Sequence, residues 1–202
     1  HTAFVRLAGQ GAATDWQLQG WYLSAQADNR QDDRSASGHS HSASTSTAFS
    51  GRFSGDTGAT GVYLETGWRW ADEQRLGLRA EWLSVAVDGQ VENDTATQGI
   101  GLEGDYQGLL LEPSLRWQAH TLALRYERLS IQNSLTGAAV GTLGAEAGLI
   151  NHGHNPQRLS VAWNWQYQPA LLLRLEWLQD KAMPEHQPQV LMLGGVWKHS
   201  LF

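Results

Sequence analysis

Residues 158–167 read RLSVAWNWQY, and their side chains alternate between apolar and polar along almost the whole stretch. One face carries Leu159, Val161, Trp163, Trp165 and Tyr167. The other face carries Ser160, Ala162, Asn164 and Gln166. A two-residue period is typical of a β-strand whose two faces meet different surroundings. The stretch therefore predicts a strand with one apolar and one polar face.

The same alternation recurs along the chain, whereas the 3.6-residue period of amphipathic helices is nearly absent. The further alternating segments are 2–10, 16–26, 59–70, 75–87, 108–118, 120–131, 170–178 and 189–202. Together with 158–167 they predict nine antiparallel strands. We expect one all-β domain over residues 1–202.

The connections between these segments alternate in length. Short connections lie at 11–15, at 71–74, around Ala119 and around 168–169. Long connections, rich in Gly, Ser, Asn, Asp and His, lie at 27–58, 88–105, 132–157 and 181–188. Outer-membrane barrels have short periplasmic turns and long extracellular loops. The pattern therefore favours an antiparallel transmembrane β-barrel over a soluble sandwich.

Aromatic residues fall in two rows on the apolar faces. The row beside the short connections consists of Trp16, Trp70, Trp117 and Tyr167. The row farther from those connections consists of Tyr22, Trp82, Tyr126 and Trp177. Between the two rows the apolar faces carry no charged residue, although 17% of the chain is charged. Two such rows predict the girdles of a membrane barrel, where aromatic rings meet lipid headgroups. Nine of the 10 tryptophans share the apolar faces, and Trp21 points the other way.

The overall composition excludes several classes of protein. The net charge of -6 argues against a nucleic-acid partner, which would leave a basic surface. The absence of cysteine excludes a disulfide scaffold and a thiolate metal site. The sequence contains no nucleophile elbow, phosphate-binding loop or dinucleotide fingerprint, so we expect no enzymatic activity.

Charged residues on the polar faces are the candidate lining of the barrel interior. They are Glu65, Arg69, Arg79, Glu81, Glu112, Arg116, Arg125, Glu127, Arg174 and Glu176. In a wide barrel they would line water and set ion selectivity. In a barrel of about eight strands they would pair with one another and fill the interior. The near-equal numbers of acidic and basic residues argue against a strongly anion-selective interior.

Histidines in the long connections suggest a further, metal-binding hypothesis. The candidate ligands are His39, His41, His152, His154 and His186. Imidazole binds zinc, copper and nickel, so these residues would form a divalent-metal site if the connections converge. We expect no other cofactor.

The carboxy-terminal segment VLMLGGVWKHSLF, residues 190–202, resembles the last strand of Gram-negative outer-membrane β-barrel proteins. Segments such as DWQLQGWYLSAQAD (15–28) and LLLRLEWLQDKA (171–182) resemble strands of porin-type channels. This resemblance implies an integral outer-membrane protein in contact with membrane lipid and lipopolysaccharide. It also implies that the barrel-assembly machinery reads Phe202. Because Leu201, rather than Phe202, continues the apolar face, either a bulge shifts the register near this end or the usual terminal signal is weak in this chain.

The resemblance implies a porin-like passive channel for small polar or ionic solutes. The alternative is a closed structural or adhesive barrel with a salt-bridged interior and partner-binding extracellular loops. Because single-chain bacterial barrels have even strand numbers, nine spans lead us to expect either one or more missing strands before His1 or a segment 2–10 that does not span the membrane. The complete barrel would then have eight to ten strands, or this chain would form the carboxy-terminal part of a larger one. The solute and the oligomeric state stay open.

Overall fold

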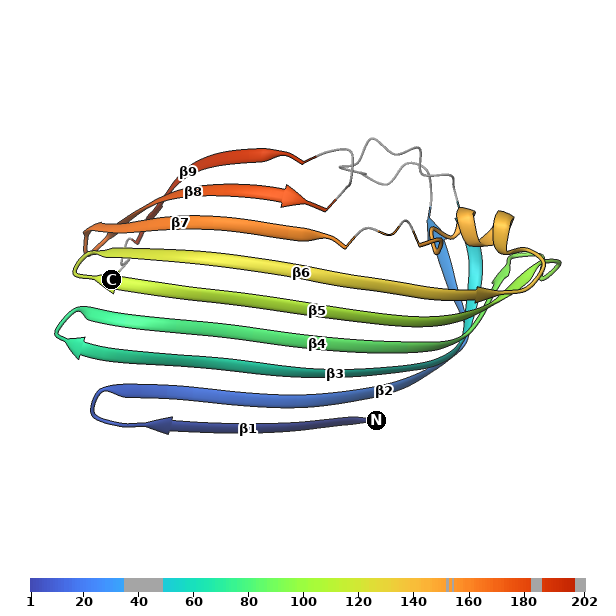
Figure 1. The fold of residues 1–202 in the computed structure, drawn as a ribbon, viewed down its shortest axis with the longest axis horizontal. Coiled ribbons are helices and arrows are strands. Elements are labelled where there is room, and N and C mark those ends of the chain that lie inside the picture. Colours follow the sequence, from blue (N-terminus) through green and yellow to red (C-terminus); the bar gives the residue numbers. More distant parts are fainter. Residues whose placement is uncertain (35–48, 152, 154, 183–186, 199–202) are drawn as a thin grey trace.

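The computed structural model describes residues 1–34, 49–151, 153, 155–182 and 187–198. Its nine strands form one antiparallel sheet, in which neighbours in the sheet are also neighbours in the chain (Figure 1). The strands are β1 (Thr2–Gln10), β2 (Thr14–Arg34), β3 (Phe49–Ala71), β4 (Gln74–Asn93), β5 (Gly99–Trp117), β6 (His120–Thr136), β7 (Gln157–Gln168), β8 (Leu171–Lys181) and β9 (Gln189–Trp197). The nine predicted antiparallel strands are confirmed.

Three of the four predicted long connections, at 27–58, 88–105 and 132–157, are shorter than expected because β2 to β6 continue into them, whereas the one at 181–188 lies between β8 and β9 as predicted. The connection expected at 88–105 is reduced to a turn between Asn93 and Gly99. The one expected at 132–157 contains the end of β6 and a helical turn, η1 (Val140–Gly144). The strands continue because apolar and polar side chains go on alternating along them. Beyond a certain residue, however, the apolar side chains lie on the opposite face of the sheet.

This change of side divides the sheet into two levels. The side chains of β4 that point to the convex face begin as Leu76, Leu78, Ala80 and Trp82, and continue as Ser84, Ala86, Asp88, Gln90 and Glu92. Those that point to the concave face begin as Arg75, Gly77, Arg79 and Glu81, and continue as Leu83, Val85, Val87, Gly89 and Val91. In the lower level, next to the short connections, the convex face is apolar. In the upper level the concave face is apolar instead.

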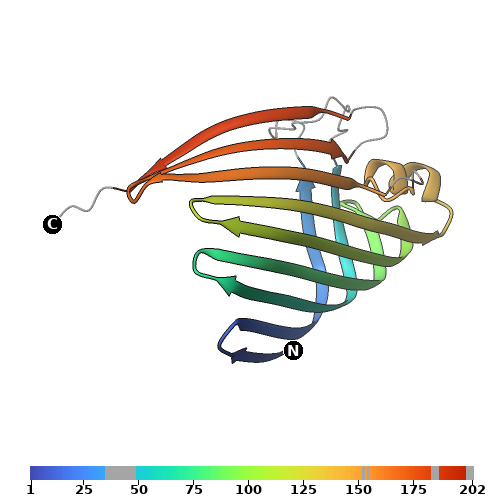
Figure 2. The ribbon, with the colours of Figure 1, turned by 60° about the vertical axis from the view of Figure 1, so that its left-hand side comes forward.

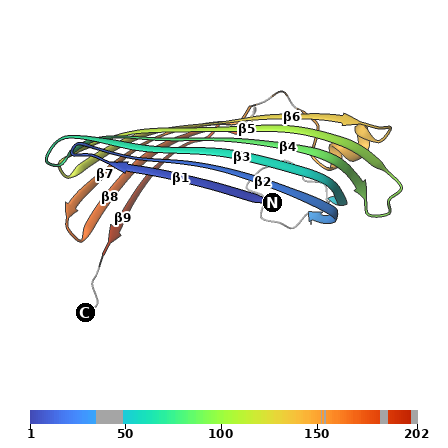
Figure 3. The ribbon, with the colours of Figure 1, turned by 90° about the horizontal axis from the view of Figure 1, so that it is seen from below.

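The buried core lies in the upper level on the concave face. Val91, Ile100 and Leu102 of the sheet pack against Leu143 of η1 and Ala147, which follows it. Figure 3 shows the sheet as an arch with this helical segment on its inner side. The residues of the convex face that form the lower level are called the apolar band below. In the described ranges no other element covers it.

The sheet is open, so the predicted closed barrel is not present in the described chain. The outer edges of β1 and β9 have no pairing partner among the described strands, and they lie at opposite edges of the sheet (Figure 2). Both strands run toward the short connections, because Gln10 pairs with Asp15 and Trp197 pairs with Leu171. Direct pairing of β1 with β9 would be parallel, unlike every other pairing in the sheet. No helix among the described residues is long and apolar enough to cross a membrane.

Candidate functional site

The polar part of the concave face is the candidate site. The strand register arranges its charged side chains in rows that cross the sheet, because each residue lies opposite a fixed partner on the next strand. We distinguish an upper row, a middle row and, next to the short connections, an arginine row. All ten predicted lining residues lie on this face by strand alternation.

The middle row pairs acidic with basic residues along β3 to β6. Glu65 lies opposite Arg79, and Arg79 lies opposite Glu112. The Nε atom of Arg125 donates to Glu112 at 2.5 Å. Arg79 also donates to Glu81, at 2.6 Å from its terminal nitrogen, and lies 5.6 Å from the centre of the Tyr63 ring. The middle row therefore balances its own charge.

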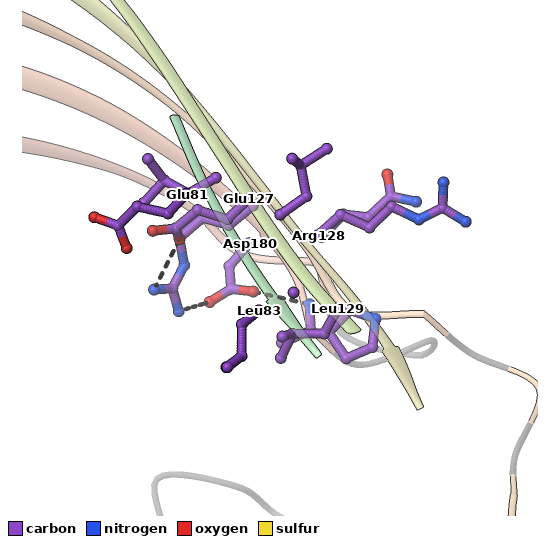
Figure 4. Close-up of a pocket in the computed structure, with 13 residues that line it drawn as sticks. Glu81, Leu83, Glu127, Arg128, Leu129 and Asp180 are labelled. Atoms are coloured by element: carbon purple, nitrogen blue, oxygen red, sulfur yellow. Dashed lines mark hydrogen bonds and ion pairs between the residues drawn. The ribbon is translucent and has the colours of Figure 1, made fainter. Parts of the chain in front are cut away.

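The upper row is centred on Arg158 of β7. Its guanidinium lies 2.8 Å from Asp180 and 3.7 Å from Glu127. These groups border a hollow of about 320 Å³ whose other walls include the side chains of Leu83, Leu110 and Leu129 (Figure 4). The hollow combines an apolar lining with charges that already have partners, so it offers little binding energy for a further ion.

The arginine row places like charges directly opposite each other. Arg75 of β4 lies opposite Arg69 of β3 on one side and Arg116 of β5 on the other. Arg75 reaches across Gly67 to form an ion pair of 2.5 Å with Asp15, while its Nε atom is buried without a hydrogen bond. Within the part of the chain that the structure describes, Arg69 and Arg116 form no ion pair.

A cavity of about 290 Å³ separates the arginine row from the middle row. Its lining includes the cations Arg75, Arg79 and Arg116, the hydroxyl groups of Ser114 and Thr121, and the carboxylates of Glu65 and Glu112. Like charges that face each other across strands destabilise a sheet. A small anion placed here would relieve that repulsion and accept hydrogen bonds from the guanidinium groups.

Arg174 and Glu176 of β8 form a separate pair on the same face, with a distance of 2.8 Å. Arg75, Arg158 and Asp180 were not among the predicted lining residues, because the predicted strands began or ended too close to them. Their signal was present: Arg75 shares the alternation of Arg79, and Asp180 shares that of Glu176.

The predicted girdle residues lie on the convex face, and their positions follow a regular slope. The cross-strand register leads from Tyr22 to Ser84 on β4, which lies two residues farther from the short connections than Trp82. The row of Trp82 reaches Arg128 on β6, two residues beyond Tyr126. The row of Tyr126 likewise reaches Gln179, two residues beyond Trp177. A constant step of this kind describes a line of equal height across tilted strands.

The lower girdle row, Trp16, Trp70, Trp117 and Tyr167, extends into a denser aromatic cluster that the sequence analysis did not single out. The His120 ring stacks on Trp163 and Trp165 with centroid distances of 5.7 and 5.9 Å. Tyr167 meets Trp165 edge to face at 5.0 Å. Arg128 shares the alternation of the apolar faces but lies beyond Tyr126, outside the band.

The predicted metal ligands His39, His41, His152, His154 and His186 lie outside the described residues, as does Phe202. Among the residues that are described, no group of three or more potential ligands is placed to hold a metal ion. The metal site and the bulge near the carboxy terminus therefore stay predictions. No protein-family model matches this sequence, and no curated protein matches it.

Proposed function

We propose that this chain is an outer-membrane β-barrel component whose concave face lines a porin-like passive channel for small polar or ionic solutes. The observation that carries the proposal is the combination of an exposed apolar band with a charged concave face at the same level. A soluble sheet reverses this arrangement, since its apolar face covers a core and its polar face meets water.

The exposure of the band supports a lipid environment. Trp117 is 59% exposed and Leu193 82% exposed, and neither has a second layer above it among the described elements. Soluble monomers rarely expose contiguous apolar surface of this extent. Lipid chains would cover the band, and its aromatic margins would lie at the two interfaces. Lipid and lipopolysaccharide are thus the proposed neighbours of the convex face.

The change of side along β2 to β6 supports the same arrangement. Above the band the convex face becomes polar, and the concave face acquires its own packed core. Strands that leave a bilayer and continue into water require this switch, because water then replaces lipid on the outside. To close this sheet into an antiparallel barrel, a further strand must pair with the outer edge of β1 on one side and with the outer edge of β9 on the other.

The arginine row suggests which ions such a channel would favour. The middle row is balanced, and the upper row contains more acidic than basic groups around Arg158. Unpaired arginines therefore concentrate at the end next to the short connections. We propose that this end holds small anions transiently while the face as a whole is weakly selective.

Conductance across planar lipid bilayers tests the proposal. The folded protein is expected to give discrete steps, and Arg116→Ala should shift the zero-current potential in a salt gradient toward cations, with permeability ratios changing on the order of twofold. Arg128→Ala, which removes an arginine from the convex face, is the matched control and should leave the potential unchanged. Silent bilayers with folded protein would exclude a channel.

A closed, non-transporting barrel is the second candidate function, and one observation favours it. The ion pairs Arg125–Glu112, Arg79–Glu81 and Arg174–Glu176 engage most of the predicted lining residues with one another. If these pairs fill the interior, folded protein would bind a surface partner through its long connections and conduct nothing. The same bilayer measurement separates the two functions.

A further inference from the structure

The convex face above the apolar band contains a continuous polar groove. One hollow of about 590 Å³ is bordered by Glu103, Asp105, Gln132, Ser134, Asn151 and Asn155, among others. A second hollow of about 310 Å³ is bordered by Asp88, Gln90, Glu103, Ser134 and Thr136, among others. Glu103 and Ser134 border both hollows, so the groove runs across β4, β5 and β6. We call it the polar groove.

The side chains of the polar groove have unused hydrogen-bonding capacity. Asp105 lies opposite Gln132, and Glu103 lies opposite Ser134. Asp88 lies opposite Glu103 on the other side. Among the described residues, none of these five side chains has a hydrogen-bond partner or an ion-pair partner within the protein. Carboxylates, an amide and a hydroxyl thus stand side by side, free to accept and donate bonds to a ligand.

One wall of the groove is held in place by a network of amide hydrogen bonds. The backbone N–H of Asn133 donates to Asn151 Oδ1 at 2.9 Å, and Asn151 Nδ2 donates to the Asn133 carbonyl at 2.6 Å. Asn133 Nδ2 donates to the Leu149 carbonyl at 2.8 Å, and the Tyr106 hydroxyl donates to Asn133 Oδ1 at 2.7 Å. The segment that carries Asn151 is therefore fixed against β6 before any ligand arrives, which lowers the entropy cost of binding.

We propose that the polar groove binds an oligosaccharide made of neutral or amino sugars. Neighbouring hydroxyl groups on a sugar ring match alternating carboxylate and amide groups, because each hydroxyl both donates and accepts. Among the described residues that border the groove there are three carboxylates and no lysine or arginine. Phosphorylated, sulfated or uronic-acid sugars would be repelled, whereas an amino sugar would be attracted.

The position of the groove matches this ligand. In this respect the inference rests on the proposed function, which places the band in lipid and the groove just outside it. The saccharide portion of a neutral glycolipid in the same leaflet, one that carries no phosphate or carboxylate, would lie at that height. A free oligosaccharide offers the same chemistry, so the experiment must distinguish the two sources.

Calorimetric titration of the full chain folded in detergent micelles tests the groove. The probes are a neutral glucose oligomer, a glucosamine oligomer and an oligogalacturonate. We expect saturable binding of the first two and at least tenfold weaker binding of the third. The double variant Glu103→Gln, Gln132→Ala should weaken binding at least tenfold, whereas Gln107→Ala, on the same face of β5 below the groove, should not. Heat-modifiable gel migration checks that each variant folds.

A second arm repeats the titration with vesicles that carry or lack a neutral glycolipid. Loss of free-oligosaccharide binding in the glycolipid vesicles alone identifies the membrane saccharide as the occupant; unchanged binding identifies the free sugar. No saturable binding by folded protein, or equal affinity for the acidic oligomer, overturns the proposal. Because the measurement needs no conduction, a silent bilayer would leave this result intact.

Discussion

Gly67 permits the ion pair between Arg75 and Asp15, although it contributes no side chain to it. It lies between Asp15 and Gly77 in the cross-strand register, and a β-carbon at this position would collide with the guanidinium of Arg75. The missing side chain is therefore the passage through which Arg75 reaches Asp15. Glycine is required at this position because the Arg75 side chain passes close to the backbone, not because the backbone adopts an unusual angle.

The variant Gly67→Val is expected to destabilise the protein by up to about 1 kcal/mol, because valine displaces the Arg75 guanidinium and breaks its partly exposed ion pair with Asp15. Urea titration of the folded protein in micelles measures the change. Gly20→Val is the matched control, since a β-carbon at Gly20 meets nothing within 4 Å. Equal stabilities of the two variants would contradict the role of the passage.

At the scale of the strands, alternation predicted all nine strands but not their full lengths, and it did not predict the helical turn η1. The strand predicted at 75–87 continues to Asn93 because Val87 and Val91 turn their apolar side chains to the concave face. The predicted strand ends where its apolar residues move to the other face, because only one apolar face was expected. The glycines near this point are also typical of a loop. The signal of a second, inverted strand segment was present in the sequence.

The arginine row could not have been predicted from the sequence. Alternation places Arg69 and Arg75 on one face, but only the register places them opposite each other. That register depends on the two-residue turn after Ala71 and on the irregularity between Arg69 and Ala71. A slip of one residue would bring other partners together, and neither feature has a clear signature in the local sequence.

The helical segment on the concave face is expected to depend on Leu143, which is fully buried. Leu143→Asp places an unpaired charge in the core and should expose residues 140–149 to limited proteolysis while β1 to β9 stay protected. Ala145→Asp, at an exposed position of the same segment, should leave the cleavage pattern unchanged. Global unfolding by the Leu143 variant would show that the segment is not a separate unit of stability.

At the scale of the whole molecule, the level of a residue on the convex face decides which substitutions are tolerated. Leu111 lies within the apolar band, and Gln107 lies above it on the same face of β5. Arginine at a lipid-facing position near the bilayer centre costs about 2–4 kcal/mol. We expect Leu111→Arg to reduce the fraction that folds into vesicles severalfold, as measured by heat-modifiable migration.

Gln107→Arg is the control for that substitution and should fold as the unmodified chain does, because water and headgroups solvate the new charge. If both arginine variants folded equally well, the band would not be in contact with lipid. Alternation along each strand predicted which face is apolar. The height at which the band ends emerges only when all nine strands are aligned.

The extent of the apolar band also sets a preferred membrane thickness. From Leu109 to Trp117 the band covers eight residue steps of β5, or about 27 Å along the strand. A strand tilt of about 40° reduces this to ~20 Å along the membrane normal. A typical hydrocarbon layer is about 30 Å thick, and the bacterial outer membrane is thinner than average. Hydrophobic mismatch should therefore make the protein fold faster in short-chain than in long-chain phosphatidylcholine vesicles, and sort it toward thin membranes.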